Sequence, residues 1–216
     1  MPTNTTVADG NIQDYSALGN LPKWDLSDLY KAEDDPELNK DLDWLRKACS
    51  NFAEDYQGKL DKLGAMGLLD AVERYQAIEV VAGKLMSFAG LRYYQLTTDA
   101  QRTKFMSDMQ DKVTKLTTPL VFYGLEFNRI SGDRIASLLS EDSGLARYKP
   151  VFDRMRAMKP YQLSDELEKF LHDQSVVGSS AWNRLFDETV ASLTFQIKGK
   201  ELPLEAATNK KKKKNR

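Results

Sequence analysis

Apolar residues recur every three or four positions through most of this chain, which predicts a mainly helical protein. The first long helix should begin at Asp35, Pro36 and Glu37. An aspartate cap, a proline at the first helical position and an early acidic residue each favour a helix start. Gly58 is suited to ending this helix. Its predicted apolar face consists of Leu38, Leu42, Leu45, Cys49, Phe52 and Tyr56.

A second long helix is predicted from about Gly67 to Leu96. Gly83 and Gly90 lie about two turns apart inside it, and each costs about 1 kcal/mol of helix propensity. We therefore expect these glycines to let another helix approach closely. A phosphate-binding role does not fit glycines that lie inside a helical pattern. The predicted apolar face consists of Leu68, Val72, Tyr75, Ile78, Ala82, Leu85, Ala89 and Tyr93.

A third helix is predicted after a turn at residues 97–99, where Thr98 and Gln101 match a capping box. Pro119 should kink or restart this helix, because proline removes one backbone hydrogen bond and clashes with the preceding turn. Residues 121–127 are apolar on nearly all sides, which predicts deep burial in the core rather than a cofactor site.

Shorter helices are predicted beyond residue 130. One of them should begin at Ser131 and end at residues 141–144. The next has an apolar face that begins with Leu145, and this helix should end at Lys159-Pro160. This region is locally basic. Its simplest interpretation is a solvated helix face, with an acidic partner as the alternative. The basic residues are Arg147, Lys149, Arg154, Arg156 and Lys159.

Residues 163–195 read as a helix, a glycine break, a second helix and the start of a strand. Ser164 is the predicted cap of the first helix and Ser179 or Ser180 of the second, on either side of Gly178. The apolar face of the first helix is expected to point inward and consists of Leu167, Phe170 and Leu171. The second helix is predicted to have another apolar face, formed by Ala181, Trp182, Leu185, Phe186 and Val190. Residues 193–198 alternate with period two, so a small β-hairpin with its turn at Gly199-Lys200 and a return strand over 201–204 is predicted.

Composition is ordinary for a globular protein, with 41% hydrophobic and 29% charged residues. The formal net charge is −1, but residues 210–216 carry six positive charges. Without them, 25 basic residues stand against 32 acidic ones, which leaves the body at about −7. An acidic body argues against general nucleic-acid binding. An alternative, in which the lysine tail binds nucleic acid or an anionic membrane, predicts strong salt dependence.

Two residues are candidates for chemistry, and neither has a partner in the sequence pattern. Cys49 is the single cysteine, so no intrachain disulfide is possible, and its place on an apolar helix face favours a buried structural thiol. His172 is the single histidine and lies beside Lys169 and Asp173, which favours a surface or partly buried structural role. No spacing of acidic residues suggests a metal site. We therefore predict no catalytic, cofactor-binding or metal-binding residue.

Several motifs in order resemble the N-terminal region of oligoendopeptidase F. They are Trp24-Asp-Leu-Ser-Asp-Leu-Tyr30, Leu163-Ser164, Gly178-Ser-Ser-Ala-Trp-Asn-Arg-Leu-Phe186 and Leu193-Thr-Phe195, and the resemblance runs from about Leu21 to Thr208. It implies a helical domain from a family of cytoplasmic zinc metallopeptidases that cleave short peptides. In that family a His-Glu-x-x-His pair and a further Glu hold zinc in a later domain. This chain lacks that motif, so we expect no zinc here and no activity by the chain alone.

The predicted organisation is a mobile arm over 1–20, a helical subdomain over 21–130, a helical subdomain over 131–208 that ends in the hairpin, and a disordered lysine-rich tail over 209–216. Within the second part, residues 21–30 are apolar enough to lie against the body as a strap. We expect the tail to mark a truncated product whose reading frame shifted or ended in an A-rich tract. Sequencing the locus would check this, because a downstream out-of-frame segment encoding His-Glu-x-x-His should follow.

Two further expectations concern location and function. No run approaches the roughly 18 apolar residues of a membrane span, and no secretory signal is visible, so the cytoplasm is the default location. The alternative function is a standalone helical module that binds a peptide or protein partner, or that self-associates through exposed apolar surface.

Overall fold

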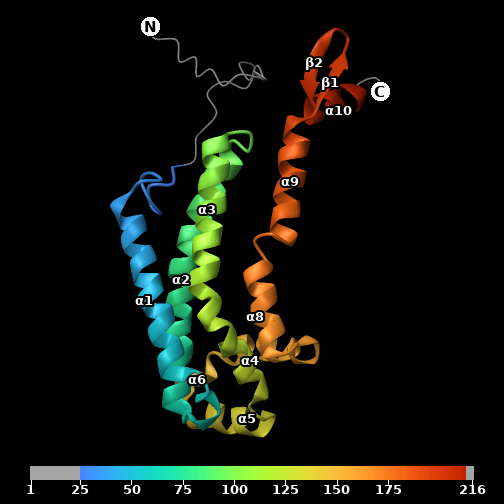
Figure 1. Ribbon diagram of the computed structural model, residues 1–216. Coiled ribbons are helices and arrows are strands. Elements are labelled where there is room, and N and C mark those ends of the chain that lie inside the picture. Colours follow the sequence, from blue (N-terminus) through green and yellow to red (C-terminus); the bar gives the residue numbers. More distant parts are fainter. Residues whose placement is uncertain (1–24, 213–216) are drawn as a thin grey trace. The chain divides into compact units, whose positions relative to one another are not determined.

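The computed structural model describes residues 25–212 (Figure 1). They form two compact units, one over Leu26–Ala181 and one from Trp182 onward. Helices dominate, and the second unit also contains a two-stranded antiparallel sheet. The predicted fold class, mainly α with long antiparallel helices and a small β-hairpin, is confirmed.

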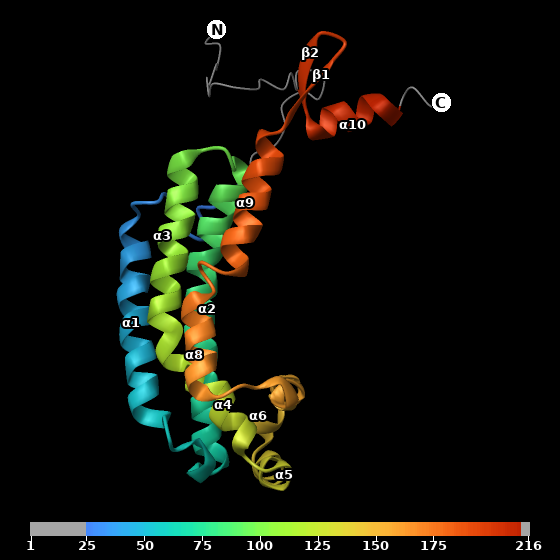
Figure 2. The same cartoon turned by 45° about the vertical axis from the view of Figure 1, so that its right-hand side comes forward.

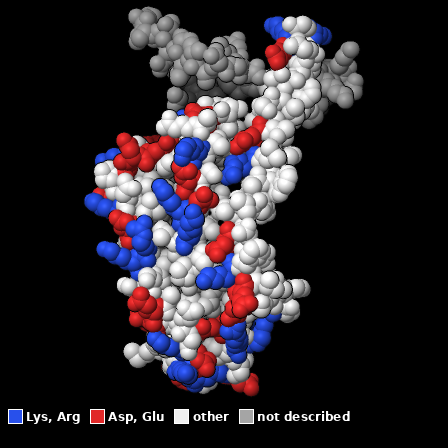
Figure 3. Space-filling model, in the orientation of Figure 1, with Lys and Arg blue, Asp and Glu red and all other residues white. Residues whose placement is uncertain are grey.

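Three long helices form the main body of the first unit. They are α1 (Pro36–Tyr56), α2 (Ala65–Gln95) and α3 (Ala100–Thr117), with the short 3₁₀ turn η2 (Leu60–Lys62) between α1 and α2. The three helices lie side by side with alternating direction in both ribbon views (Figures 1 and 2). Acidic and basic side chains are interspersed over the face of this unit that Figure 3 shows.

Shorter helices continue the first unit. The 3₁₀ turn η3 (Thr118–Leu120) follows α3 directly, and α4 (Val121–Arg129) restarts the chain after Pro119, as predicted for a proline at this place. The remaining elements are α5 (Gly132–Glu141), α6 (Ser143–Ala146), α7 (Lys149–Ala157), η4 (Lys159–Tyr161) and α8 (Asp165–Gln174).

Local capping explains several helix starts. The side chains of Asp35, Ser131 and Ser164 each accept a backbone N–H of the helix that follows, as predicted. The predicted capping box at Thr98 is wrong. Asp99 caps α3 instead, and its Oδ1 accepts the backbone N–H groups of Gln101 at 2.9 Å and Arg102 at 3.0 Å. A carboxylate binds two free N–H groups better than a hydroxyl one residue earlier.

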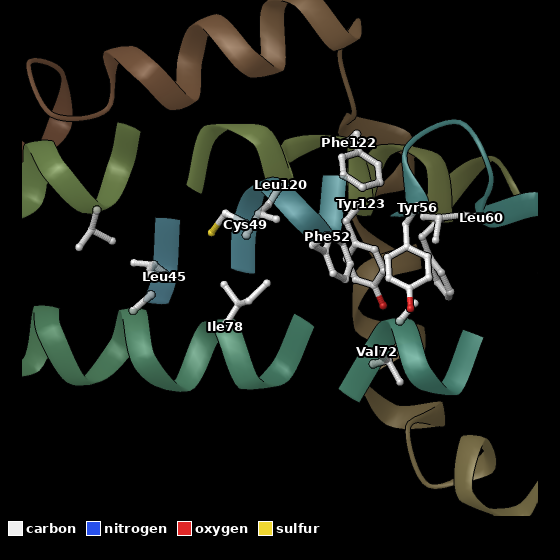
Figure 4. Packing of buried hydrophobic residues seen from close by; sticks show 14 of the residues in the cluster. Leu45, Cys49, Phe52, Tyr56, Leu60, Val72, Ile78, Leu120, Phe122 and Tyr123 are labelled. Atoms are coloured by element: carbon white, nitrogen blue, oxygen red, sulfur yellow. The ribbon is translucent and has the colours of Figure 1, made fainter. Parts of the chain in front are cut away.

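One core runs through the first unit. Buried side chains from Tyr30 to Phe152 pack into a single cluster, which crosses the boundary that we predicted at residue 130. Phe52 is fully buried and packs against the rings of Tyr56, Phe122 and Tyr123 at centroid distances of 4.9, 5.9 and 5.5 Å (Figure 4). The apolar run at 121–127 supplies three residues of this cluster, namely Phe122, Tyr123 and Phe127, and Leu125 in the same run is also buried.

The predicted strap is confirmed over its described part, residues 25–30. Leu26 and Leu29 pack against the core and Tyr30 is buried. The Tyr30 hydroxyl donates to Asp41 at 2.6 Å, and the ammonium of Lys84 lies 4.2 Å from the centre of the Tyr30 ring. Trp24 and the predicted mobile arm lie outside the described residues.

The expectation for Gly83 and Gly90 is wrong. A Cβ added at Gly83 would meet no atom within 4 Å, and one at Gly90 would meet only Tyr94 of the same helix at 3.9 Å. No other helix therefore comes within 4 Å of the Cβ position at either glycine. The spacing of the two glycines was consistent with a helix contact, but it does not reveal whether another helix packs against that face of α2.

The second unit contains α9 (Ser179–Ser192) for most of its length, β1 (Thr194–Ile197), β2 (Lys200–Pro203) and α10 (Leu204–Lys212). The strands pair from Thr194 with Pro203 to Ile197 with Lys200. Positive φ angles at Lys198 and Gly199 place the two-residue turn there, one position earlier than we predicted. Helix α10 packs on both strands and buries Ala207.

The boundary of the predicted disordered tail differs from the structure. Helix α10 continues through Asn209 to Lys212, where the sequence was expected to be without regular structure. Alanine and lysine both have high helix propensity, which allows the helix to extend into the lysine run. Residues 213–216 lie outside the described part. Across residues 25–212, no helix has the length and apolar character needed to cross a membrane.

The inward orientation predicted for the apolar face of α8 is wrong, and the predicted apolar face of α9 is also exposed. In the first unit, Leu167, Phe170 and Leu171 are 51%, 57% and 50% exposed. In the second unit, Trp182 and Phe186 are 70% and 67% exposed. Amphipathic spacing shows that a face favours burial, and it does not show that the covering surface belongs to the same chain.

Candidate functional site

A pocket of the first unit lies among α2, α3, η3, α4 and α8. It has a volume of about 430 Å³. Most of its lining is apolar, and four side chains bring a carboxylate, two hydroxyls and an imidazole. The lining residues are Tyr75, Glu79, Ala82, Gly83, Met86, Val113, Thr117, Leu120, Val121, Gly124 and His172.

Helix geometry explains how α2 supplies nearly half of this lining. Tyr75, Glu79, Ala82, Gly83 and Met86 recur at spacings of three and four, so they share one helix face. Gly83 leaves open space above that face, because a Cβ there would meet nothing within 4 Å. The glycine that we assigned to helix packing therefore contributes to a recess.

The break at Pro119 builds the opposite wall. Because the proline ends α3 and restarts the chain as α4, Thr117 lies at the end of one helix and Val121 near the start of the next. Gly124, one turn into α4, also has no neighbour within 4 Å of the position that its Cβ would occupy. Two helix ends and two glycines thus leave a space that longer side chains would fill.

His172 closes one side of the pocket from α8. Its Nε2 lies 3.3 Å from the Thr117 hydroxyl and 3.3 Å from the backbone oxygen of Thr114. Because a carbonyl oxygen can only accept, Nε2 must carry the hydrogen that it donates to Thr114. The neighbouring Asp173 accepts from the hydroxyl of Thr118 at 2.5 Å, so two successive residues of α8 are bonded to the end of α3.

Glu79 dominates the electrostatics. Burial raises the pKa of Tyr75 well above its usual value, and the charge of Glu79 and a hydrogen bond to its carboxylate raise it further. Burial and then the charge of Glu79 raise the pKa of the Cys49 thiol to about 11. Among residues 25–212, none of the ion pairs involves Glu79. Within the described residues, Glu79 therefore has no salt-bridge partner to offset its negative charge.

The arrangement fits binding better than covalent catalysis. The Thr117 hydroxyl donates to the backbone oxygens of Val113 and Thr114 at 3.0 and 3.2 Å, so its hydrogen is engaged within its own helix. Cys49 is 1% exposed, and a raised thiol pKa disfavours the reactive thiolate. Within the described range, no three His, Cys, Asp or Glu side chains are grouped so that they could hold a metal ion.

Cys49 and His172, the two candidate residues from the sequence, occupy different environments in the structure. Cys49 belongs to the core, as predicted, and His172 is partly buried at the rim of the pocket. Glu79, Tyr75 and Thr117 were not identified as site residues. They come from helices whose relative placement no local pattern reveals, and the only available signal was the pair of glycines at 83 and 124.

Comparisons with known proteins identify a family. A family model described as Oligopeptidase F matches residues 126–195, which begin within α4 and include α5 to α9. Oligoendopeptidase F, plasmid, from Lactococcus lactis subsp. cremoris is 30% identical over 148 residues, which are 68% of this chain and 24% of that protein. This chain is related to the N-terminal region of oligoendopeptidase F. The resemblance predicted from the sequence motifs is confirmed.

Two further comparisons extend this result. Oligopeptidase PepF from Bacillus subtilis is 23% identical over 188 residues, which are 85% of this chain and 27% of that protein. The crystal structure of oligoendopeptidase F from Enterococcus faecium has a TM-score of 0.68 at 19% identity, over 80% of this chain and 33% of that one, which shows a shared fold. The chain spans about a quarter of the length of the oligoendopeptidase F relatives that it matches.

Proposed function

We propose that this chain is the non-catalytic, helical N-terminal part of an oligoendopeptidase F-type peptidase. The observation that carries the proposal is the combined match in sequence and fold to oligoendopeptidase F proteins. In the whole protein this part would help to wall the substrate cleft, and it would limit access to short, flexible peptides. The proposal places that activity in the cytoplasm.

The described residues do not fit the zinc that such a peptidase implies. Two histidines and a carboxylate on a common site are the minimum of that ligand set. The whole sequence contains one histidine, and residues 25–212 hold no suitable cluster around it. Zinc and the water that it activates would have to be held by another part of the protein. We therefore expect the chain alone to be inactive.

The exposed apolar face of α8 supports the proposal that another part of a longer protein packs against it. Leu167, Phe170 and Leu171 form one stripe on this helix, Leu163 lies just before the helix, and all four are about half exposed. The stripe lies within the segment that matches the family model. Because the matched relatives are about four times as long as the aligned part, the remainder of such a protein is the occupant that we propose for this stripe.

A hybrid enzyme tests this proposal. Residues 26–195 of this chain would replace the corresponding region of the Lactococcus lactis oligoendopeptidase F, and cleavage of a quenched-fluorescent peptide would be measured with and without a chelator. We expect chelator-sensitive cleavage by the hybrid. Phe170→Asp should abolish cleavage, whereas Met66→Asp, at a position 79% exposed on α2, should leave it nearly unchanged. A hybrid that is folded and holds zinc but cleaves nothing would contradict the proposal.

A second candidate function rests on α9. Trp182, Leu185 and Phe186 are exposed on one face of this helix, and Figure 3 shows few charged side chains along it. Such a face also suits a standalone module that binds a partner or a second copy of itself. Light scattering of the purified chain distinguishes this candidate. A stable dimer that Trp182→Asp converts to a monomer would favour it, and a monomer at all concentrations would count against self-association.

A further inference from the structure

We propose that the pocket among α2, α3, η3, α4 and α8 binds a primary ammonium group attached to a small apolar group. The pocket belongs entirely to the first unit, and its volume of about 430 Å³ lies in the usual range for sites that bind small molecules. This inference rests on the geometry of the pocket and does not depend on the proposed peptidase role.

The charge of the lining selects a cation. Glu79 is the acidic residue of the lining, and no lysine or arginine lines the pocket with it. Since none of the ion pairs within residues 25–212 uses Glu79, its carboxylate is available to a charged ligand. Glu79 is exposed to solvent, so water screens its attraction for an opposite charge, and this attraction should give only weak binding.

The hydrogen-bonding groups also suit an ammonium ion. A primary ammonium group has three donors and no acceptor. The lining offers oxygen acceptors from Glu79, Tyr75 and Thr117. The hydrogen of the Thr117 hydroxyl is already engaged with backbone oxygens, so this oxygen faces any further ligand as an acceptor. An anionic ligand would meet the carboxylate without a lysine or arginine in the lining to compensate for it.

The rest of the lining sets the shape of the ligand. Met86, Val113, Leu120 and Val121 give an apolar wall, and the two glycines leave the recess open. An apolar group of the size of a leucine side chain would gain favourable burial there. The pocket thus joins one negative end to an apolar interior, and this combination favours an amine with a hydrophobic substituent.

Two probes of nearly equal shape test the assignment. Leucyl-leucine amide carries the ammonium group, and 4-methylpentanoyl-leucine amide replaces that group by hydrogen. Binding of each to the full chain would be measured by titration calorimetry and by NMR line shifts. We expect the charged probe to bind with a Kd in the millimolar range and the neutral probe to bind at least about tenfold more weakly.

Variants locate the binding. Glu79→Gln should weaken binding of the charged probe about tenfold, because it removes the charge at nearly constant shape. Gly83→Leu should block binding by filling the recess, and it should fold because leucine has a higher helix propensity than glycine by about 1 kcal/mol. Glu73→Gln, on the same helix and outside the pocket lining, is the matched control and should leave binding unchanged.

Several results would overturn the assignment. Equal binding of the two probes would show that the charge is not recognised. Unchanged binding by Glu79→Gln and by Gly83→Leu would place the probe elsewhere, and absence of saturable binding up to about 10 mM would mean that the pocket does not hold this class of ligand. The activity of the hybrid peptidase does not depend on whether these probes bind. Failure of one proposal is therefore distinguishable from failure of the other.

Discussion

Replacing Tyr123 by phenylalanine is expected to stabilise the protein. Tyr123 is 2% exposed, and within the described residues its hydroxyl has no hydrogen-bond partner. Its ring stacks on Tyr75 at a centroid distance of 4.4 Å and meets the edge of Phe52. Burial, followed by the nearby tyrosine hydroxyls, raises the pKa of Tyr123 well above its usual value. The variant removes the oxygen and keeps the ring.

The magnitude follows from the desolvation of that hydroxyl. A buried polar group without a partner costs about 1–3 kcal/mol. The aromatic contacts of Tyr123 involve the ring and persist in phenylalanine. We therefore expect Tyr123→Phe to raise the free energy of unfolding by about 1–3 kcal/mol. Most single substitutions destabilise a protein, so a gain of this size from the removal of one oxygen atom would be unusual.

Two other tyrosines provide matched controls of the opposite kind. The Tyr30 hydroxyl donates to the carboxylate of Asp41 at 2.6 Å, so Tyr30→Phe should lower stability by about 1.5–3 kcal/mol. The Tyr148 hydroxyl donates to Gln76 at 2.9 Å near the surface, so Tyr148→Phe should lower it by no more than about 1 kcal/mol. The three variants delete the same atom in three environments.

Urea denaturation measures all three effects. With a slope of about 2 kcal/mol per molar urea, a gain of 2 kcal/mol moves the midpoint up by about 1 M. The slope should be the same in every variant, since none changes the surface exposed on unfolding. If Tyr123→Phe lowered the midpoint by as much as Tyr30→Phe, the Tyr123 hydroxyl would be hydrogen-bonded in solution and our description of this part of the core would be wrong.

Three further predictions concern the core and its charges. Phe52→Ala should lower the free energy of unfolding by about 3–5 kcal/mol, because Phe52 is fully buried among four aromatic rings; chemical denaturation would show this, and a loss under 1 kcal/mol would contradict it. Cys49, whose thiol pKa is about 11, should react with a disulfide reagent at pH 8 far more slowly in buffer than above the urea midpoint, and rapid native labelling would show that the thiol is accessible. Burial opposes ionisation of Asp41, but hydrogen bonds from Tyr30 and Lys84 outweigh it and lower its pKa. The stability difference between the wild type and Asp41→Asn should therefore be complete above the usual aspartate pKa of about 3.9 and should shrink as the pH falls through the lowered pKa of the folded protein. A difference that did not change with pH would exclude this ionisation as its source.

Local signals predicted most of the secondary structure. Helix starts at Asp35, Ser131 and Ser164 were predictable because a capping side chain and its N–H partner are two or three residues apart. The start of α3 was misplaced because Thr98 and Asp99 are adjacent and both can cap. Nothing within a few residues decides between them, and the geometry of the whole turn does.

Tertiary relations were less predictable. The sequence pattern correctly predicted a helix around the glycines of α2 and an amphipathic helix at α8. It wrongly predicted what packs against these two helices. Gly83 faces a recess instead of another helix, and Leu167 is exposed instead of buried. The pocket was invisible in the sequence for the same reason. Its polar residues, Glu79, Thr117 and His172, come from three helices, and their proximity depends on the restart at Pro119 and on the docking of α8.

The most direct test of the central claim is an assay of the purified full chain for zinc content and peptide cleavage in the same sample. Elemental analysis would give the zinc bound per chain, and a quenched-fluorescent peptide would report turnover with and without a chelator. We predict substoichiometric zinc and no chelator-sensitive turnover, because the chain contains one histidine and its described residues form no metal-ligand cluster. One zinc per chain together with chelator-sensitive turnover would contradict the claim, because the catalytic site would then belong to this chain.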